Sequence, residues 1–304
     1  MEKTLTIFTP AFNRAHTLPR LYESLLRQTS ADFEWLIVDD GSSDNTRELV
    51  QQWISQATMP IRYIHQQNQG MHGAHNTAYK HIATELNVCI DSDDYMPDNA
   101  VEIIVHFWEQ HGNEQYAGLI GLDQMMGGGL IGAAFPDDLK ETTLLGYYES
   151  GGSGDKKLVY RTEVIKRYPE YPIFSGEKYV GLAYKYYLVD QDMPLLVCNE
   201  VLCIVEYQQD GSSFSMFRQY WNNPRGFAFY RKERMKVVSS AKRRFIENIH
   251  YVSSALIAGE KQFIAQSPLP AYTVLALPFG WLLKQYIGYK VRKGAKMNFN
   301  KTGS

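Results

Sequence analysis

Short apolar runs alternate with amphipathic segments along the first 110 residues of the chain. The apolar runs have the character of buried strands, and the segments between them carry apolar residues at helical spacing, as at Leu18, Leu21 and Leu25. This alternation predicts an α/β fold with a mostly parallel central sheet. The expected strands are 5–9, 34–38, 61–65 and 88–90, and the expected helices are 18–28, 46–56, 73–84 and 98–111.

The pattern becomes less regular in the second part of the chain. Strands are expected at 117–122, 158–160 and 195–205, and a helix is expected at 176–189. From residue 214 onward the sequence is helical in pattern and rich in Lys and Arg. We therefore expect a domain over 1–212, with halves 1–115 and 116–212, and a helical, basic C-terminal extension over 213–304.

Carboxylates gather where two of the apolar runs end. Asp39 and Asp40 follow one run, and Asp91, Asp93 and Asp94 follow another within four positions. In open α/β sheets the carboxyl ends of the strands line the ligand-binding crevice, so both groups should face one cleft. Three adjacent carboxylates repel one another unless a cation or several donors neutralise them, which indicates a metal site. The alternative for each group is a polar turn that caps the next helix.

The composition of the chain indicates which classes of protein it could belong to. The chain has 304 residues, 44% of them hydrophobic, which is sufficient for a large core, and its net charge of -2 gives no argument for a nucleic-acid partner. Its three cysteines lie in apolar runs without metal-ligand spacing, as expected of reduced thiols in a cytoplasmic protein. The N-terminus lacks the pattern of a secretory signal, and the apolar segment 271–283, interrupted by Pro278 and Gly280, is too short to span a membrane.

The first 110 residues contain four motifs, which are Thr9-Pro10-Ala11-Phe12-Asn13-Arg14, Val38-Asp39-Asp40-Gly41-Ser42-Ser43-Asp44-Asn45-Thr46, Asn68-Gln69-Gly70 and Asp91-Ser92-Asp93-Asp94. In order and spacing they resemble the motifs of family 2 glycosyltransferases with the GT-A fold. The resemblance implies a Rossmann-like nucleotide-diphospho-sugar transferase fold, an inverting mechanism, a nucleotide-diphosphate sugar as donor and a divalent cation, Mn or Mg. It also implies a saccharide or lipid-linked saccharide as acceptor, in surface polysaccharide biosynthesis.

The same resemblance implies roles for the acidic residues. Asp93 is the first choice as metal ligand, Asp91 would contact the ribose or share the metal, and Asp94 could exchange roles with Asp93. A hard cation held by carboxylates neutralises the diphosphate so that it can leave. Asp40 would accept a hydrogen bond from the base edge, most simply N3–H of uracil, and Asp39 would support the loop or the ribose.

Other donor-binding residues follow from the motifs. Thr9 and Ala11 would line the base pocket through their backbone, and Arg14 would approach the base or a phosphate. The remaining members of the expected donor site are Asn13, Gly70 and Ser92.

Inversion requires a carboxylate that deprotonates the acceptor hydroxyl. Glu177 is the expected base, with Asp190 and Asp192 as alternatives. The match to the family is looser here, because many members carry Glu-Asp where this chain has Glu177-Lys178.

Two other functions compete with transfer. A sugar-phosphate nucleotidyltransferase also uses strand-end carboxylates and a metal, but it usually has a glycine-rich first loop, and residues 9–16 contain no glycine. The second competitor is a non-catalytic nucleotide-sugar-binding protein. Separately, the apolar and basic C-terminal segment could contact an anionic bilayer at the inner face of the plasma membrane, or it could be a helix packed on the catalytic domain.

Overall fold

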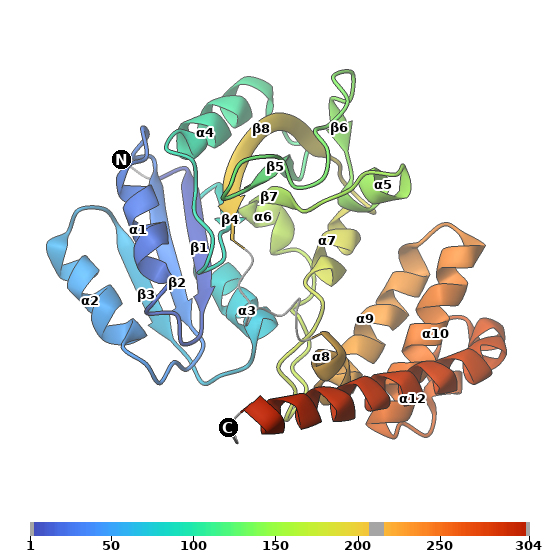
Figure 1. The fold of residues 1–304 in the computed structure, drawn as a ribbon. Helices are drawn as coiled ribbons and strands as arrows, with labels where there is room; N and C mark the ends of the chain where they lie inside the picture. The colour runs from blue at the N-terminus through green and yellow to red at the C-terminus, as the bar shows by residue number, and fades with distance from the viewer. Residues whose placement is uncertain (1–2, 207–215, 302–304) are drawn as a thin grey trace. The chain divides into compact units, whose positions relative to one another are not determined.

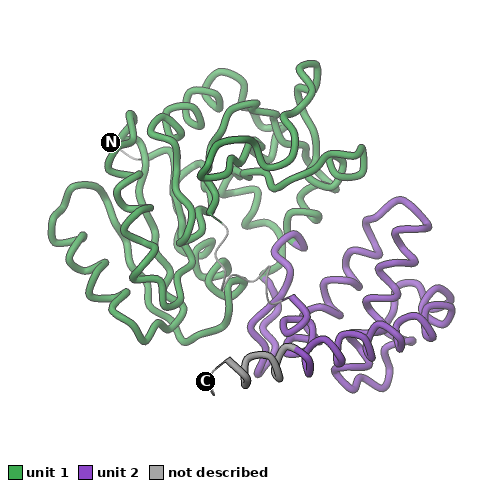
Figure 2. Tube along the Cα trace, viewed as in Figure 1, with its two compact units in different colours: residues 1–170, 185–208 green, residues 171–184, 209–304 purple. Residues whose placement is uncertain are grey.

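The computed structural model describes residues 3–206 and 216–301, with side chains described up to residue 293. The chain forms two compact units (Figure 2). Unit 1 consists of Met1–Glu170 and Lys185–Gln208, and unit 2 consists of Tyr171–Tyr184 and Gln209–Ser304. The expected domain boundary at residue 212 lies outside the described residues.

Unit 1 is built on an eight-stranded sheet with the order β3-β2-β1-β4-β7-β5-β8-β6 (Figure 1). β1 pairs in parallel with β2 and β4, β2 with β3, and β5 with β8. Only β7 and β6, among the described strands, run antiparallel to their neighbours, so the sheet is mostly parallel, as predicted. The strands are β1 (Leu5–Ala11), β2 (Phe33–Asp39), β3 (Ile61–His65), β4 (Leu86–Cys89), β5 (Gly118–Met125), β6 (Glu141–Thr142), β7 (Lys156–Arg161) and β8 (Leu195–Val205).

Helices cover both faces of this sheet, because side chains alternate along each strand. Leu5 and Ile7 of β1 belong to the core formed with α1, α2 and α4. Phe8 faces the other way, and its ring centroid lies 5.0 Å from that of His75 on α3. The helices of unit 1 are α1 (Leu18–Leu26), α2 (Thr46–Gln56), α3 (Met71–His81), α4 (Ala100–His111), α5 (Leu144–Glu149), α6 (Thr162–Ile165) and α7 (Ala183–Val189), whose first two residues belong to unit 2.

The strand order reverses direction at β1. From β1 the chain builds outward through β2 and β3 on one side, and it then places β4 on the other side of β1. A reversal of this kind leaves a crevice at the carboxyl ends of the flanking strands, which is where α/β proteins bind ligands. The loops after β1, β2 and β4 therefore meet at this edge, and those after β2 and β4 carry the acidic motifs.

Unit 2 is helical. Its core joins α9, α10, α11 and α12 through Met235, Val252, Phe263 and Ala276. Thr273 of α12 is buried and donates its hydroxyl to Asn248 Oδ1 of α10 at 2.7 Å. Over residues 3–206 and 216–301, none of the helices combines the length and the apolar composition of a membrane span. The helices are α8 (Met216–Asn222), α9 (Pro224–Val237), α10 (Ala241–Ala258), α11 (Phe263–Gln266) and α12 (Pro270–Lys301).

One expectation for the second part of the chain is corrected. The helix expected at 176–189 begins only at Ala183, because Gly176 has a φ of +80° and the backbone N–H of Lys178 donates to the distant Asn223 side chain in place of a helical carbonyl. The C-terminal segment is helical, as expected, and Pro278 lies inside the 32-residue helix α12.

Candidate active site

The loops that follow β1 and β2 are joined by a set of hydrogen bonds. Asn13 has a φ of +55°, in the left-handed region, and its Oδ1 accepts a hydrogen bond from the backbone N–H of Ser43 at 2.8 Å. Its own backbone N–H donates to Ser42 Oγ at 2.8 Å. The backbone N–H of Arg14 donates to Thr46 Oγ1 at 3.2 Å. Asn13 therefore organises the edge of the site through its backbone conformation and its side chain together.

Asp39 is fully buried at the end of β2. Its carboxylate accepts a hydrogen bond from the backbone N–H of Ser42 at 2.8 Å and another from the hydroxyl of Tyr63 on β3. Burial and this hydrogen bond raise the pKa of Tyr63 well above its usual value. The side chain thus holds the turn after β2.

Asp40 is buried as well, and its carboxylate binds the loop that leads into α3. It accepts hydrogen bonds from the backbone N–H groups of Gln69 at 2.8 Å and Gly70 at 2.7 Å, and from Gln66 Nε2 at 2.7 Å. Gly70 has a φ of +85° and precedes the first residue of α3. Gly41, with a φ of +83°, allows close approach, because a Cβ there would lie 3.0 Å from the backbone nitrogen of Asn68.

The side chains of Thr9 and Ala11 belong to the interior of unit 1. Thr9 Oγ1 accepts a hydrogen bond from Trp35 Nε1 at 3.0 Å, and both residues are fully buried. The carbonyl oxygen of Ala11 accepts the backbone N–H of Asp40 at 2.8 Å. Thr9 and Ala11 therefore stabilise the strands next to the site through these hydrogen bonds.

The acidic turn after β4 presents its carboxylates in two directions. Asp91 and Asp93 are partly exposed, whereas Ser92 and Asp94 are buried. The turn is closed by a hydrogen bond from the backbone N–H of Asp94 to the carbonyl oxygen of Asp91 at 3.0 Å. Burial and the charge of Asp91 raise the pKa of Asp93. Asp91 and Asp93 are therefore the two carboxylates of the turn that a ligand could reach.

Asp94 points toward the sheet. Its Oδ1 accepts the backbone N–H of Glu206, just beyond β8, at 3.2 Å. Burial raises the pKa of Asp94 to about 7 despite the nearby ammonium of Lys157. This geometry assigns Asp94 to the attachment of the turn to β8.

Two basic residues outside the motifs place positive charge close to the carboxylates of the acidic turn. Lys157 of β7 lies with its Nζ 4.0 Å from Asp123 Oδ1. Burial disfavours its charged form, yet the negative charges of Asp123, Asp94 and Asp91 outweigh burial and raise the pKa of Lys157 well above its usual value. Lys157 thus remains a fixed cation beneath the acidic turn.

The second is Arg20, on α1. Its guanidinium donates to the backbone carbonyl oxygen of Asp93 and forms an ion pair with Glu206. It also lies 5.1 Å from the ring centroid of Tyr95. Sequence reasoning missed Arg20 and Lys157, because each is isolated in the sequence and meets the turn only through the fold.

The carboxylates of the acidic turn could supply some of the ligands that a hard divalent cation needs. Magnesium and manganese are commonly held by one or two carboxylates together with substrate phosphates and water. Asp91 and Asp93 could supply these carboxylates. Among the described residues no group of three or more His, Cys, Asp or Glu side chains is arranged to hold a metal ion by itself. The remaining ligands would therefore come from a bound diphosphate and solvent.

Glu177 lies in unit 2 and is buried. Its Oε1 accepts hydrogen bonds from the backbone N–H of Arg225 at 3.1 Å and from Arg225 Nε at 2.9 Å. Its Oε2 accepts the backbone N–H of Gly226 at 2.8 Å. These groups form the first turn of α9, where a negative charge is favoured by the unpaired N–H groups and the helix dipole. Glu177 therefore fixes the segment 171–182 to α9.

Asp190 and Asp192 lie in unit 1, before the first residue of β8. Because β8 is parallel to β5, and β5 shares its direction with β1 and β4, this is the amino edge of the sheet, opposite the acidic turn. Asp190 caps α5 by accepting the backbone N–H of Leu145 at 2.7 Å, and burial raises the pKa of Asp190 to about 6. Asp192 accepts the hydroxyl of Tyr168 at 2.6 Å. The structure does not bring either residue to the acidic turn.

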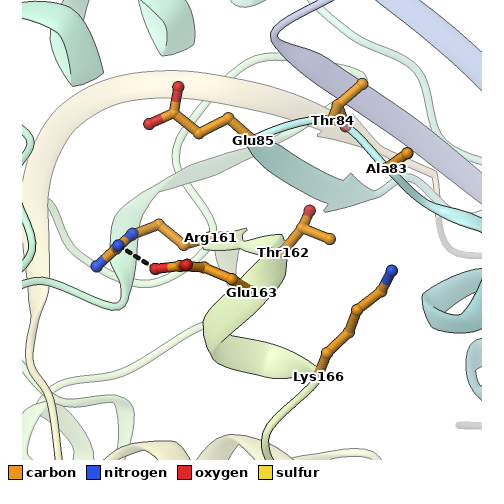
Figure 3. A pocket seen from close by; sticks show the side chains of 7 residues that line it. All are labelled: Ala83, Thr84, Glu85, Arg161, Thr162, Glu163 and Lys166. Carbon is orange, nitrogen blue, oxygen red and sulfur yellow. Dashed lines mark hydrogen bonds and ion pairs between the residues drawn. The ribbon is translucent and has the colours of Figure 1, made fainter.

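A hollow of about 480 Å³ is found at the same amino edge (Figure 3). Its charged side chains already have partners: Arg161 pairs with Glu163, Glu85 accepts Trp108 Nε1 at 2.7 Å, and Lys166 donates to a backbone carbonyl. It lies far from the predicted site residues along the strands. We therefore assign it no role in catalysis.

Residues 6–167 match the family described as "Glycosyl transferase family 2". Chondroitin synthase of Escherichia coli is 36% identical over 99 residues, 33% of this chain and 14% of that protein. The "UDP-Glc:alpha-D-GlcNAc-diphosphoundecaprenol beta-1,3-glucosyltransferase WfgD" of Escherichia coli is 34% identical over 99 residues, 33% of this chain and 38% of that protein. The similarity thus spans well under half the length of these curated relatives.

Solved structures resemble the whole chain. Residues 1–349 of S. aureus TarS in complex with UDP-GlcNAc superpose with a TM-score of 0.61 at 16% identity, over 95% of this chain and 92% of that one. The mannosyltransferase PcManGT from Pyrobaculum calidifontis, in complex with GDP-Man and Mn2+, has a TM-score of 0.55 at 15% identity, over 99% of this chain and 88% of that one. These similarities show the GT-A fold.

Proposed function

Because the chain belongs to glycosyl transferase family 2, we propose that it is an inverting glycosyltransferase that uses a UDP-sugar. The observation that carries the proposal is the convergence of Asp39, Asp40, Asp91 and Asp93 at the carboxyl edge of the sheet, where the strand order reverses. Crevices at this position bind nucleotides in α/β proteins. The UDP-GlcNAc held by TarS supports the choice of nucleotide.

The base would be recognised at the loops after β2 and β3. The donors to Asp40 include two backbone groups that fix the loop and the side-chain amide of Gln66. A rotation of Gln66 would release one acceptor position for N3–H of uracil while the loop stays in place. An ionised carboxylate only accepts hydrogen bonds, which suits an imide N–H.

The cation would be held by Asp91 and Asp93, the reachable carboxylates of the acidic turn. When bound, Mn or Mg neutralises the diphosphate as it leaves. Arg20 binds the backbone of the turn at Asp93, and Lys157, which pairs with Asp123, places a positive charge near the same carboxylates. Arg14, whose charge acts on Asp93, is placed to approach a phosphate.

Of the three candidate bases we propose Glu177, since Asp190 and Asp192 lie at the opposite edge of the sheet. The acceptor would be a saccharide or a lipid-linked saccharide. Support comes from the names of two relatives, chondroitin synthase and a glucosyltransferase for a diphosphoundecaprenol-linked sugar. A lipid-linked acceptor would place the protein at the cytoplasmic face of the membrane.

Calorimetric titration with UDP-GlcNAc, UDP-glucose and GDP-mannose, each with and without Mn, tests this function. We expect a UDP-sugar to bind in the presence of Mn, and Asp93→Asn to weaken that binding at least about tenfold because it removes one charge beside the cation. Asp98→Asn is the matched control, because Asp98 is exposed and pairs only with Arg27 in the described structure.

Two enzyme assays separate the proposal from its competitors. Slow, Mn-dependent hydrolysis of the bound UDP-sugar without acceptor is expected of a transferase. Binding without any hydrolysis or transfer would indicate a non-catalytic protein. Release of pyrophosphate from UTP and a sugar phosphate would indicate a nucleotidyltransferase.

A further inference from the structure

The outer face of α12 is apolar. Large side chains recur there at helical spacing, and Leu275 and Leu282 are 66% and 57% exposed. Phe217 of α8 is also exposed and contacts this face, with its ring centroid 5.6 Å from that of Tyr286. We call this surface the α12 face. Its members are Val274, Leu275, Phe279, Trp281, Leu282, Tyr286, Tyr289 and Phe217.

The opposite side of α12 is already used within unit 2. Thr273, Ala276 and Ile287 are buried, and Gly280 lies so close to α10 that a Cβ would meet Val252 Cγ1 at 2.4 Å. A helix that packs on one neighbour is usually polar on its outer side, but α12 is apolar on both sides. Packing against α10 therefore does not explain the exposed apolar side chains of α12. Exposed apolar surface of this extent marks a site of interaction.

The charges around the α12 face have one sign. Residues 270–301 contain no Asp or Glu, whereas they contain five Lys and one Arg. Lys290 lies over the rings of Phe217 and Tyr286, at 5.8 and 5.4 Å from their centroids, and Arg292 and Lys293 are exposed one turn further along the helix. Basic side chains thus continue the apolar face and approach its aromatic rings.

We propose that the α12 face binds the surface of an anionic bilayer, with the helix lying in the plane of the membrane. Leu275, Phe279 and Leu282 would enter the boundary between headgroups and acyl chains, and Trp281 and Tyr286 suit that boundary because they are apolar with one polar group. Lys290, Arg292 and Lys293 would contact lipid phosphates.

Charge decides between a bilayer and a second copy of this chain. Two copies joined by the α12 face would leave the basic residues of each helix without a carboxylate on the other helix to pair with, because residues 270–301 contain none. Anionic headgroups complement the same residues. Because α12 is attached to α10 along its inner side, only its outer side is available to a bilayer. This arrangement suits a helix that lies parallel to the membrane surface.

Flotation of the intact protein with vesicles tests this binding. We expect the protein to float with phosphatidylcholine vesicles that contain about a third phosphatidylglycerol, and to remain behind with phosphatidylcholine alone. Leu275→Glu and Leu282→Glu should each weaken binding about tenfold or more, from the loss of an inserted side chain. Neutralising Lys293 should weaken it about fivefold. Leu26→Glu is the control, because Leu26 is 45% exposed on α1 of unit 1.

Fluorescence gives an independent measure of insertion. Lipids brominated on the acyl chain should quench the intact protein, and Trp281→Phe, which keeps the surface apolar, should remove most of that quenching. The proposal is overturned if the intact chain does not float, if Leu275→Glu floats as the parent does, or if light scattering shows a dimer that Leu275→Glu dissociates. Flotation needs neither donor nor acceptor, so its result is independent of the proposed transfer reaction.

Discussion

Glu177→Gln separates two roles of one carboxylate. In the structure both oxygens accept hydrogen bonds at the first turn of α9, two of them from backbone N–H groups. A glutamine keeps one acceptor oxygen and turns its NH2 group toward a backbone donor. A charge-assisted hydrogen bond contributes about 1.5–3 kcal/mol, and a charge at a helix N-terminus about 0.3–1 kcal/mol. Because the Arg225 side chain is 39% exposed, its ion pair adds little, and we expect a loss of about 2–3 kcal/mol of stability.

Urea unfolding followed by far-UV circular dichroism measures this loss. The control is Glu233→Gln, which breaks the ion pair of Glu233 with the exposed Lys236 on the same helix and should cost less than about 0.5 kcal/mol. If Glu177 is also the base, turnover should fall about 10²- to 10⁴-fold while the affinity for the donor is unchanged. Near-normal turnover would remove Glu177 from the mechanism, and unchanged stability would refute its attachment to α9.

Three further changes test other parts of the structure. Thr9→Val should cost about 1–2 kcal/mol in urea unfolding without changing donor affinity, because it leaves the indole N–H of Trp35 without its acceptor; weaker donor binding at equal stability would show that the hydroxyl contacts the donor. Asn13→Ala should destabilise more than Asn13→Gly, by about 1 kcal/mol, since glycine adopts the left-handed backbone more readily than alanine does; equal losses would mean that the hydrogen bonds alone matter. Burial and Arg231 lower the pKa of His250 from 6.5 to about 4, so stability present above pH 6.5 should be lost as the pH falls to about 4, by up to about 3 kcal/mol. His250→Gln should flatten that slope in urea titrations at several pH values, and an unaltered slope would contradict the assignment.

The first half of the fold could be predicted because its local signals agree with its tertiary structure. Apolar runs become strands buried on both faces, and helical spacing marks the sides of α1 and α4 that cover them. The direction of β7 could not be predicted, because it depends on pairing with β4 and β5, which are distant in sequence. Pro278 is tolerated within α12, where α10 packs along the helix and Gly280 permits the close approach.

One part of the candidate site could likewise be predicted from the sequence, and another part could not. The position of Asp39, Asp40, Asp91 and Asp93 at one edge of the sheet could be predicted, because each lies at or just beyond the carboxyl end of a parallel strand. The motifs do not distinguish the reachable Asp93 from the inward-facing Asp94, since that difference arises from Glu206, which is 112 residues away. Nor could the sequence pair Glu177 with Arg225 or Arg20 with the acidic turn, because such contacts exist only once the chain has folded.

The chain passes between its two units three times, after residues 170, 184 and 208. Residues 171–184 are inserted between two stretches of the sheet unit, yet Glu177 is anchored on α9, and Gly226 approaches Tyr179 so closely that a Cβ would lie 1.9 Å from its carbonyl oxygen. Deleting everything after residue 208 would therefore strip that insertion of its support. The helical unit therefore cannot be exchanged between relatives by replacing only the residues after 208. A chimaeric protein must take residues 171–184 from the same parent as the helices.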